Sequence, residues 1–124
     1  MAAKSATPLE LPGLTGKIVV ITGAARGQGY AEALVLLASG AHVIATDLNE
    51  TCPAPLEKAA AKLPGELHYA QLDVTSEDDW SALARFLKKE FKQVHGLVNN
   101  AGIPFRGRIG EIARADWDKV FSIN

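Results

Sequence analysis

Short apolar runs alternate along this chain with longer stretches in which apolar residues recur every three or four positions. The runs are rich in Val, Ile and Leu, which is typical of buried parallel strands; the predicted strands are Lys17–Thr22, His42–Asp47, Leu67–Asp73 and His95–Asn99. The stretches between them have the period of helices; these are predicted at about Tyr30–Ser39, at about Leu56–Leu63 and after Ser76. Strands and helices in alternation predict an α/β fold, with a parallel sheet and right-handed crossovers.

Apolar spacing and capping residues refine the predicted helices. We expect the first helix to end at Gly40 and to bury one stripe, formed by Ala31, Leu34, Val35 and Ala38. The second helix is rich in Ala and Lys and stops at Pro64-Gly65. In the third, Ser76 can cap the first turn, and the acidic residues 77–79 favour the positive end of the helix dipole. Its predicted apolar face consists of Trp80, Leu83, Ala84, Leu87 and Phe91.

A glycine-rich turn, Thr22-Gly23-Ala24-Ala25-Arg26-Gly27-Gln28-Gly29, joins the first predicted strand to the first helix. Gly23 allows a tight exit from the strand, Gly27 lets the backbone approach phosphates, and Gly29 leaves room where helix and sheet pack. Asp47 ends the next strand, about twenty residues on, where a carboxylate can bind a ribose. This context predicts a dinucleotide cofactor, and a glycine turn without a ligand is the alternative.

Composition narrows the class of protein. The 124 residues, 48% of them hydrophobic, are expected to form a lead-in at 1–15 and one domain at 16–124. Thirteen basic and fourteen acidic residues are spread along the chain, which argues against nucleic acid or a membrane as the main partner. Cys52 is the only cysteine, so a reducing cytoplasm is the expected location, and we expect neither a signal peptide nor a membrane span. No metal site is predicted.

The chain resembles the short-chain dehydrogenase/reductase family in several motifs. The family's glycine motif is filled by Thr22, Gly23, Gly27 and Gly29. Leu72-Asp73-Val74 resembles its adenine-contacting strand end, Asn99-Asn100-Ala101-Gly102 matches its Asn-Asn-Ala-Gly signature, and Leu14-Thr15-Gly16-Lys17 resembles its usual start. The resemblance implies the first four strands of a Rossmann-type doubly wound sheet. It also implies hydride transfer between a nicotinamide and a secondary alcohol or ketone.

Residue chemistry and the resemblance together give a set of cofactor-binding residues. The set is Thr22, Gly23, Arg26, Gly27, Gln28, Gly29, Asp47, Leu48, Asp73, Val74, Asn100, Ala101 and Gly102. The resemblance implies that Asp73 accepts the adenine amino group while the Val74 N–H meets a ring nitrogen; a turn or cap acid leading into Ser76 is the alternative for Asp73. We expect a structural role for Asn99, and a wall of the cofactor site at Asn100, Ala101 and Gly102.

Asp47 and Arg26 point to different cofactors. A carboxylate can accept hydrogen bonds from both ribose hydroxyls of NAD, but it repels the extra phosphate of NADP. In related enzymes a basic residue at the position of Arg26 often accompanies NADP. We predict NAD, because the repulsion acts at close range in a partly desolvated pocket whereas an Arg can swing away. A solvated turn acid is the alternative role for Asp47.

The last predicted helix combines apolar residues with one polar residue. Trp117, Val120 and Phe121 lie at i, i+3 and i+4, and Asn124 at i+7 falls on the same stripe. We therefore expect the Asn124 side chain to point inward with the apolar face. A satisfied core amide and a frayed terminal residue are two structural interpretations of Asn124. The resemblance implies a third role, because Asn124 matches the family's catalytic Asn, which holds a water in a proton relay beneath the active-site Lys.

The rest of the family's catalytic machinery is not in these 124 residues. The resemblance implies a Ser, a Tyr and a Lys four residues after that Tyr, but the fourth residues after Tyr30 and Tyr69 are Leu34 and Asp73. We therefore expect the N-terminal part of a longer oxidoreductase, inactive alone, whose later strands supply the substrate pocket and much of a dimer or tetramer interface. A non-catalytic dinucleotide-binding or partner-binding module is the alternative.

Overall fold

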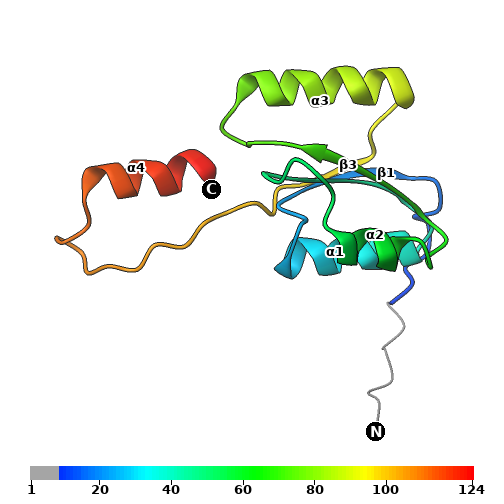
Figure 1. Ribbon diagram of the computed structural model, residues 1–124, viewed down its shortest axis with the longest axis horizontal. Coiled ribbons are helices and arrows are strands. Elements are labelled where there is room, and N and C mark those ends of the chain that lie inside the picture. The colour runs from blue at the N-terminus through cyan, green and yellow to red at the C-terminus, as the bar shows by residue number, and fades with distance from the viewer. Residues whose placement is uncertain (1–8) are drawn as a thin grey trace, which may run out of the picture.

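One parallel sheet organises the computed structural model, which describes residues 9–124. Its order is β3-β2-β1-β4, with the strands β1 Ile18–Thr22, β2 His42–Asp47, β3 Glu66–Gln71 and β4 Gly96–Val98 (Figure 1). The chain winds outward from β1 to β3 and then crosses to β4 on the other side of β1. This confirms the predicted α/β doubly wound sheet with four strands. The expectation of a lead-in without a signal peptide falls largely on residues 1–8, which lie outside the described residues.

The strand boundaries differ from the predictions mainly at the edges of the sheet. β2 has the predicted bounds because it lies between β1 and β3 along its whole length. β3 stops at Gln71, since the Asp73 N–H turns away to the carboxylate of Asp79 at 2.8 Å. β4 contains only residues 96–98, because its partners are limited to Val19–Ile21 of β1. An edge strand with one neighbour therefore ends sooner than its apolar sequence suggests.

Helices cover both faces of the sheet (Figure 1). The four helices are α1 Gly27–Ala38, α2 Ala54–Ala60, α3 Glu77–Glu90 and α4 Arg114–Ile123. Side chains alternate along β1, so that Val19 and Ile21 face α1 and α2 while Ile18 and Val20 face α3. None of the helices in residues 9–124 is long and apolar enough to cross a bilayer.

Helix α1 buries a stripe that is rotated from the predicted one and shares only Ala38 with it. Ala31 is exposed, and Leu34 and Val35 are only partly buried. The buried side of the helix is formed by Gly29, Ala33, Leu37 and Ala38. Gly29 sets this rotation, because it lies against the glycine-rich turn and the residues four and eight positions later fall on the same side. Ala38 is buried as predicted, but the prediction was wrong for Ala31, Leu34 and Val35, because spacing alone allows several neighbouring stripes in so apolar a helix.

Helix α3 begins as predicted, with the Ser76 hydroxyl accepting a hydrogen bond from the Asp79 N–H at 3.2 Å. Its apolar face is less deeply buried than expected. Leu83 is buried, Ala84 is exposed, and Phe86 joins the packed residues in its place. Packing on this face of the sheet is therefore thinner than on the face of α1 and α2.

Helix α4 contradicts the expectation of an inward apolar stripe. Within α4 no residue is buried; Trp117 is 52% exposed and Phe121 is 68% exposed. The two rings stack on each other, with centroids 4.9 Å apart. Asn124 is exposed as well. The reason is visible in Figure 1, where a long extended segment after β4 carries α4 away from the sheet.

Candidate functional site

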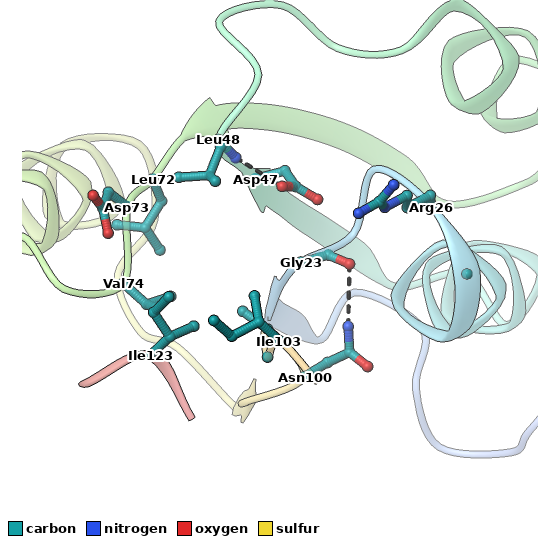
Figure 2. Close-up of a pocket in the computed structure, with 13 residues that line it drawn as sticks. Gly23, Arg26, Asp47, Leu48, Leu72, Asp73, Val74, Asn100, Ile103 and Ile123 are labelled. Atoms are coloured by element: carbon teal, nitrogen blue, oxygen red, sulfur yellow. Dashed lines mark hydrogen bonds between the residues drawn. The ribbon is translucent and has the colours of Figure 1, made fainter. Parts of the chain in front are cut away.

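A cavity of about 380 Å³ opens at the carboxyl ends of the four strands, where a doubly wound sheet binds ligands. Figure 2 shows side chains from the ends of all four strands around it. Ten of the predicted cofactor residues line the cavity, namely Gly23, Arg26, Gly27, Asp47, Leu48, Asp73, Val74, Asn100, Ala101 and Gly102. The structure therefore brings together residues that are far apart in the sequence. Thr22, Gln28 and Gly29 do not line the cavity.

Two glycines of the turn lie so close to other backbone that no side chain fits. Gly23 has φ +69°, and a Cβ there would lie 2.9 Å from the Ala101 Cα. A Cβ on Gly29 would lie 2.4 Å from the Gly23 carbonyl oxygen and 2.5 Å from the Asn100 Nδ2. Such separations are far inside van der Waals contact, so both positions require glycine. The tight exit at Gly23 and the close packing at Gly29 have the physical basis expected from the sequence.

The third glycine faces open space. Gly27 has φ +61°, and no atom lies within 4 Å of where its Cβ would be. It begins α1, whose first N–H groups have no acceptor within the helix. The preceding residue, Arg26, provides no side-chain cap, and no acidic side chain lies in the first turn. This helix end is therefore a positive, uncapped backbone surface that suits a phosphate. The neighbouring Gln28 side chain is exposed and donates to Glu32 at 2.9 Å.

Thr22 connects the turn to the loop after β4. Its buried hydroxyl oxygen accepts hydrogen bonds from the N–H groups of Asn100 at 3.1 Å and Ala101 at 3.0 Å. The Asn100 side chain in turn donates to the carbonyl oxygen of Thr22 at 3.0 Å. It also donates to that of Gly23 at 3.1 Å (Figure 2). The structural role expected of Asn99 thus belongs to Asn100, while Asn99 is exposed.

Asp47 holds the opposite side of the turn. Its Oδ2 accepts from the Ala25 N–H at 2.9 Å, and its Oδ1 accepts from the Leu48 N–H at 2.8 Å. Figure 2 shows the carboxylate at the cavity, between Leu48 and Arg26. Each oxygen keeps a further lone pair for a hydroxyl donor. The geometry is compatible with both roles considered for Asp47, as a turn acid and as a ribose ligand.

Side chains of β3 fix the loop that follows Asp47. The Gln71 Nε2 donates to the Leu48 carbonyl at 2.9 Å, and the Tyr69 hydroxyl donates to the Asn49 carbonyl at 2.8 Å. Burial, with a smaller contribution from the negative charge of Asp47, raises the pKa of Tyr69 to about 12. Tyr69 therefore stays neutral and keeps donating well above neutral pH.

Asp73 follows the end of β3, on the far side of the cavity. Its Oδ1 accepts from both the N–H and the hydroxyl of Thr75, at 2.9 and 2.7 Å. These two hydrogen bonds hold the pKa of Asp73 below its usual value. The alternative of a turn acid therefore has direct geometric support, although Asp73 also lines the cavity.

Asn124 joins the end of α4 to the loop after β4. Its Oδ1 accepts from the Ile103 N–H at 2.9 Å, and its Nδ2 donates to the Ile103 carbonyl at 3.1 Å. A Cβ on Gly102 would lie 3.4 Å from the Asn124 Oδ1, so the side chain also lies close to the cavity wall. Asn124 is thus satisfied, as expected, but by backbone at the surface rather than in a core.

Three apolar residues, Leu72, Ile103 and Ile123, line the cavity in addition to the predicted cofactor-binding set. Leu72 belongs to the Leu72-Asp73-Val74 segment that carries the family resemblance, whereas Ile103 and Ile123 adjoin the predicted residues Gly102 and Asn124. These three residues supply the apolar walls that a planar ring system needs.

Residues 17–124 match the model of the short chain dehydrogenase family. The chain belongs to this family. Among curated short-chain dehydrogenases it is 32% identical to cyclopentanol dehydrogenase of Comamonas testosteroni, over 87% of this chain and 43% of that protein. It is 36% identical to 3-alpha-(or 20-beta)-hydroxysteroid dehydrogenase of Mycobacterium tuberculosis, over 90% of this chain and 42% of that protein.

Solved short-chain dehydrogenases have the same arrangement. A short-chain dehydrogenase/reductase from Burkholderia xenovorans superimposes with a TM-score of 0.83 at 28% identity, covering 89% of this chain and 46% of that one. L-sorbose reductase of Gluconobacter frateurii, solved with NADPH and L-sorbose, gives 0.80 at 26% identity, covering 90% and 43%. The chain spans less than half the length of the relatives named here.

Proposed function

We propose that this chain is the cofactor-binding part of an NAD-dependent oxidoreductase, which transfers hydride between the nicotinamide and a secondary alcohol or ketone. The observation that carries the proposal is the cavity, which is lined by the uncapped start of α1, by the backbone of Gly23 and by Asp47. The site fits a dinucleotide because the space at Gly27 is open where phosphates would meet free N–H groups. The cofactor would supply the redox chemistry, while these residues bind and orient it.

Asp47 supports NAD rather than NADP in this proposal. Its two oxygens lie at the cavity and face the backbone of the turn, so an added 2′-phosphate would meet a fixed negative charge at short range. Arg26 also lines the cavity and carries the opposite charge. It makes no side-chain cap contact, so its charge is less closely held than that of Asp47. L-sorbose reductase, which is similar to this chain, was solved with NADPH, so NADP is the alternative cofactor that the test must distinguish.

The ratio of affinities for NADP and NAD tests this assignment. Asp47→Ala should raise that ratio by about tenfold or more, since removing a charge contact of about 1.4 kcal/mol changes an equilibrium constant tenfold. Titration calorimetry with each cofactor measures it, and Glu50→Ala, which removes an exposed acid from the following loop, is the matched control. General damage to the turn would weaken both cofactors alike. An unchanged ratio would therefore remove Asp47 from the ribose site.

The catalytic step itself is proposed for the whole protein. Asn124 is the one catalytic residue that the family resemblance places in this chain, and no Tyr-x-x-x-Lys is present among the 124 residues. A Tyr without a nearby cation is a weak base at neutral pH. We propose that these residues bind NAD weakly and do not turn over; loss of NADH absorbance with a ketone would refute this. A homo-oligomer in the cytoplasm, acting on a small alcohol or ketone, completes the proposal.

A further inference from the structure

Three side chains of types that bind metal ions meet at the amino ends of β2 and β3, opposite the edge that carries the nucleotide cavity. His42 begins β2 and lies beside Glu66, which begins β3. His68 lies two residues further along β3, so its side chain emerges on the same face as that of Glu66. No sequence motif predicts this cluster, because its members come from two strands that only the sheet brings together.

The separations between the three side chains match those of a small cation site. Their nearest ligand atoms all lie within 4.8 Å of one another. The His42 Nδ1 is 3.5 Å from one carboxylate oxygen of Glu66, and the His68 Nε2 is 2.9 Å from the other. Tetrahedral zinc with bonds of about 2.0–2.1 Å places its ligand atoms about 3.3 Å apart. Small side-chain rotations would therefore bring all three onto one ion.

Burial adds a second, independent observation. The His42 Nδ1 and the His68 Nε2 are buried, and within residues 9–124 neither has a hydrogen-bond partner. The Glu66 carboxylate lies near both nitrogens without forming an aligned hydrogen bond to either. Buried polar atoms are nearly always satisfied, so two such nitrogens aimed at one carboxylate indicate a missing bound group.

Aromatic side chains of α3 and its C-terminal end close the site on one side. The ring of Phe91 lies 5.2 Å from that of His68 and 6.0 Å from that of His42, and Phe86 lies 6.2 Å from His68. They hold both imidazoles in place, with the two rings nearly parallel at 13°. The Glu66 side chain is 60% exposed, so an ion can still enter from solvent. Two imidazoles packed against aromatic rings, beside one exposed carboxylate, form a partly organised site.

We propose that His42, Glu66 and His68 form a Zn²⁺ site, with the His42 Nδ1, the Glu66 carboxylate and the His68 Nε2 as ligands and a water as the fourth. Two imidazoles with one carboxylate suit zinc better than Mg²⁺ or Ca²⁺, which prefer oxygen ligands. The bound ion would clamp β2 to β3 at the edge remote from the nucleotide. This site is independent of the proposed hydride transfer.

Zinc titration of the protein, purified without a polyhistidine tag, tests the proposal. We expect one Zn²⁺ per chain by calorimetry, a higher unfolding temperature with zinc, and visible ligand-field bands of a four-coordinate site when Co²⁺ replaces it. Glu66→Gln and His68→Gln should each weaken binding by more than about tenfold, since even loss of an outer partner of a ligand costs roughly 10- to 100-fold.

Two variants serve as matched controls. His95→Asn removes the third histidine but keeps an acceptor for the Ile18 N–H, and Cys52→Ser removes the only thiol. Both should bind zinc as the unchanged protein does. Circular dichroism checks folding; because Glu66 is exposed, Glu66→Gln decides the test if His68→Gln unfolds. Absence of binding, or equal binding by folded Glu66→Gln, would overturn the proposal and leave a simple pairing of histidines with a carboxylate.

Discussion

The two faces of the sheet differ in how completely they are packed. On the face of α1 and α2, Ile21, Leu37 and Leu56 are fully buried. On the other face, α3 contributes one buried side chain, Leu83, and α4 lies apart from the sheet (Figure 1). The cofactor turn leads into α1 on the first face, while Leu72 and Val74, which also line the nucleotide cavity, pack on the second. Among the described residues, the sheet thus has a well-packed core on the face of α1 and α2 and thinner packing on the face of α3.

The largest predicted effect compares a core residue with an aromatic residue of α4. Leu37→Ala should lower the free energy of unfolding by about 2–5 kcal/mol, because it leaves a cavity where the side chain is 0% exposed. Trp117→Ala should change it by about 0.5 kcal/mol or less, since the ring is 52% exposed. Urea unfolding followed by circular dichroism measures both. A large loss from Trp117→Ala would mean that α4 packs against the domain in solution, and the comparison would fail.

Two glycines allow a similar comparison between a tightly packed backbone position, Gly29, and a less crowded one, Gly96. Gly29→Ala should destabilise the protein by about 1–3 kcal/mol, because the new methyl would collide with the Gly23 carbonyl and the Asn100 side chain. The gain in helix propensity of about 1 kcal/mol offsets only part of this. Gly96→Ala in β4 is the control, since its Cβ would meet Val19 at an ordinary 3.7 Å. Equal stability of the two variants in urea would show that the turn can relax around a side chain.

The elements of the fold also differ in how well the sequence predicts them. The strands of the sheet interior and the Ser76 cap follow from local pattern, because burial on both faces makes continuous apolar runs and a cap is a matter of a few residues. The stripe buried by α1 does not follow from pattern. That stripe depends on the contact of Gly29 with the turn, a tertiary fact that periodicity does not contain.

The candidate site divides in a similar way. The turn and Asp47 are predictable because a motif and its spacing specify one physical task. The bonds of Asn100 to the turn and of Asn124 to Ile103 join segments 77 or 78 and 21 residues apart, respectively, and no sequence spacing encodes them. The inward stripe expected for α4 was wrong because an apolar face shows that a surface needs a partner, without saying where the partner lies.

The third prediction concerns the hydrogen bonds that join Thr22, at the end of β1, to the loop after β4. Thr22→Val keeps the shape of the side chain but removes the buried oxygen that accepts from the Asn100 and Ala101 N–H groups. We expect a loss of about 1–2 kcal/mol in the free energy of unfolding, since the Ala101 N–H loses its acceptor and the Asn100 N–H keeps only the Val98 carbonyl, at 3.0 Å. Thr22→Ser retains the oxygen and should recover most of that loss in the same urea titration. Failure of Ser to do better than Val would assign the effect to packing rather than to the hydrogen bonds.

A smaller effect is expected where α4 joins the loop after β4. Asn124→Ala removes both hydrogen bonds to Ile103 at an exposed position, so the global free energy of unfolding should fall by about 1 kcal/mol or less. Amide hydrogen exchange should rise in α4 and at Ile103, and stay unchanged in α1, because the two faces are packed independently. Faster exchange throughout the domain would show instead that α4 supports the sheet.

The last effect lies on the well-packed side and emerges only at high pH. Burial raises the pKa of Tyr69 to about 12 in the folded chain, whereas an unfolded tyrosine titrates near 10. Between about pH 10 and about pH 12 the unfolded chain releases a proton that the folded chain retains, so stability falls as pH rises, by less than about 1.4 kcal/mol per pH unit. Tyr69→Phe should flatten this part of the pH dependence measured by urea unfolding, at the cost of the hydrogen bond to Asn49 at neutral pH. An alkaline slope that persists in Tyr69→Phe would place the titrating group elsewhere. Loss of the slope in Tyr69→Phe would identify Tyr69 as the titrating group. Its hydroxyl is the one that holds the loop after Asp47, which forms one wall of the cavity.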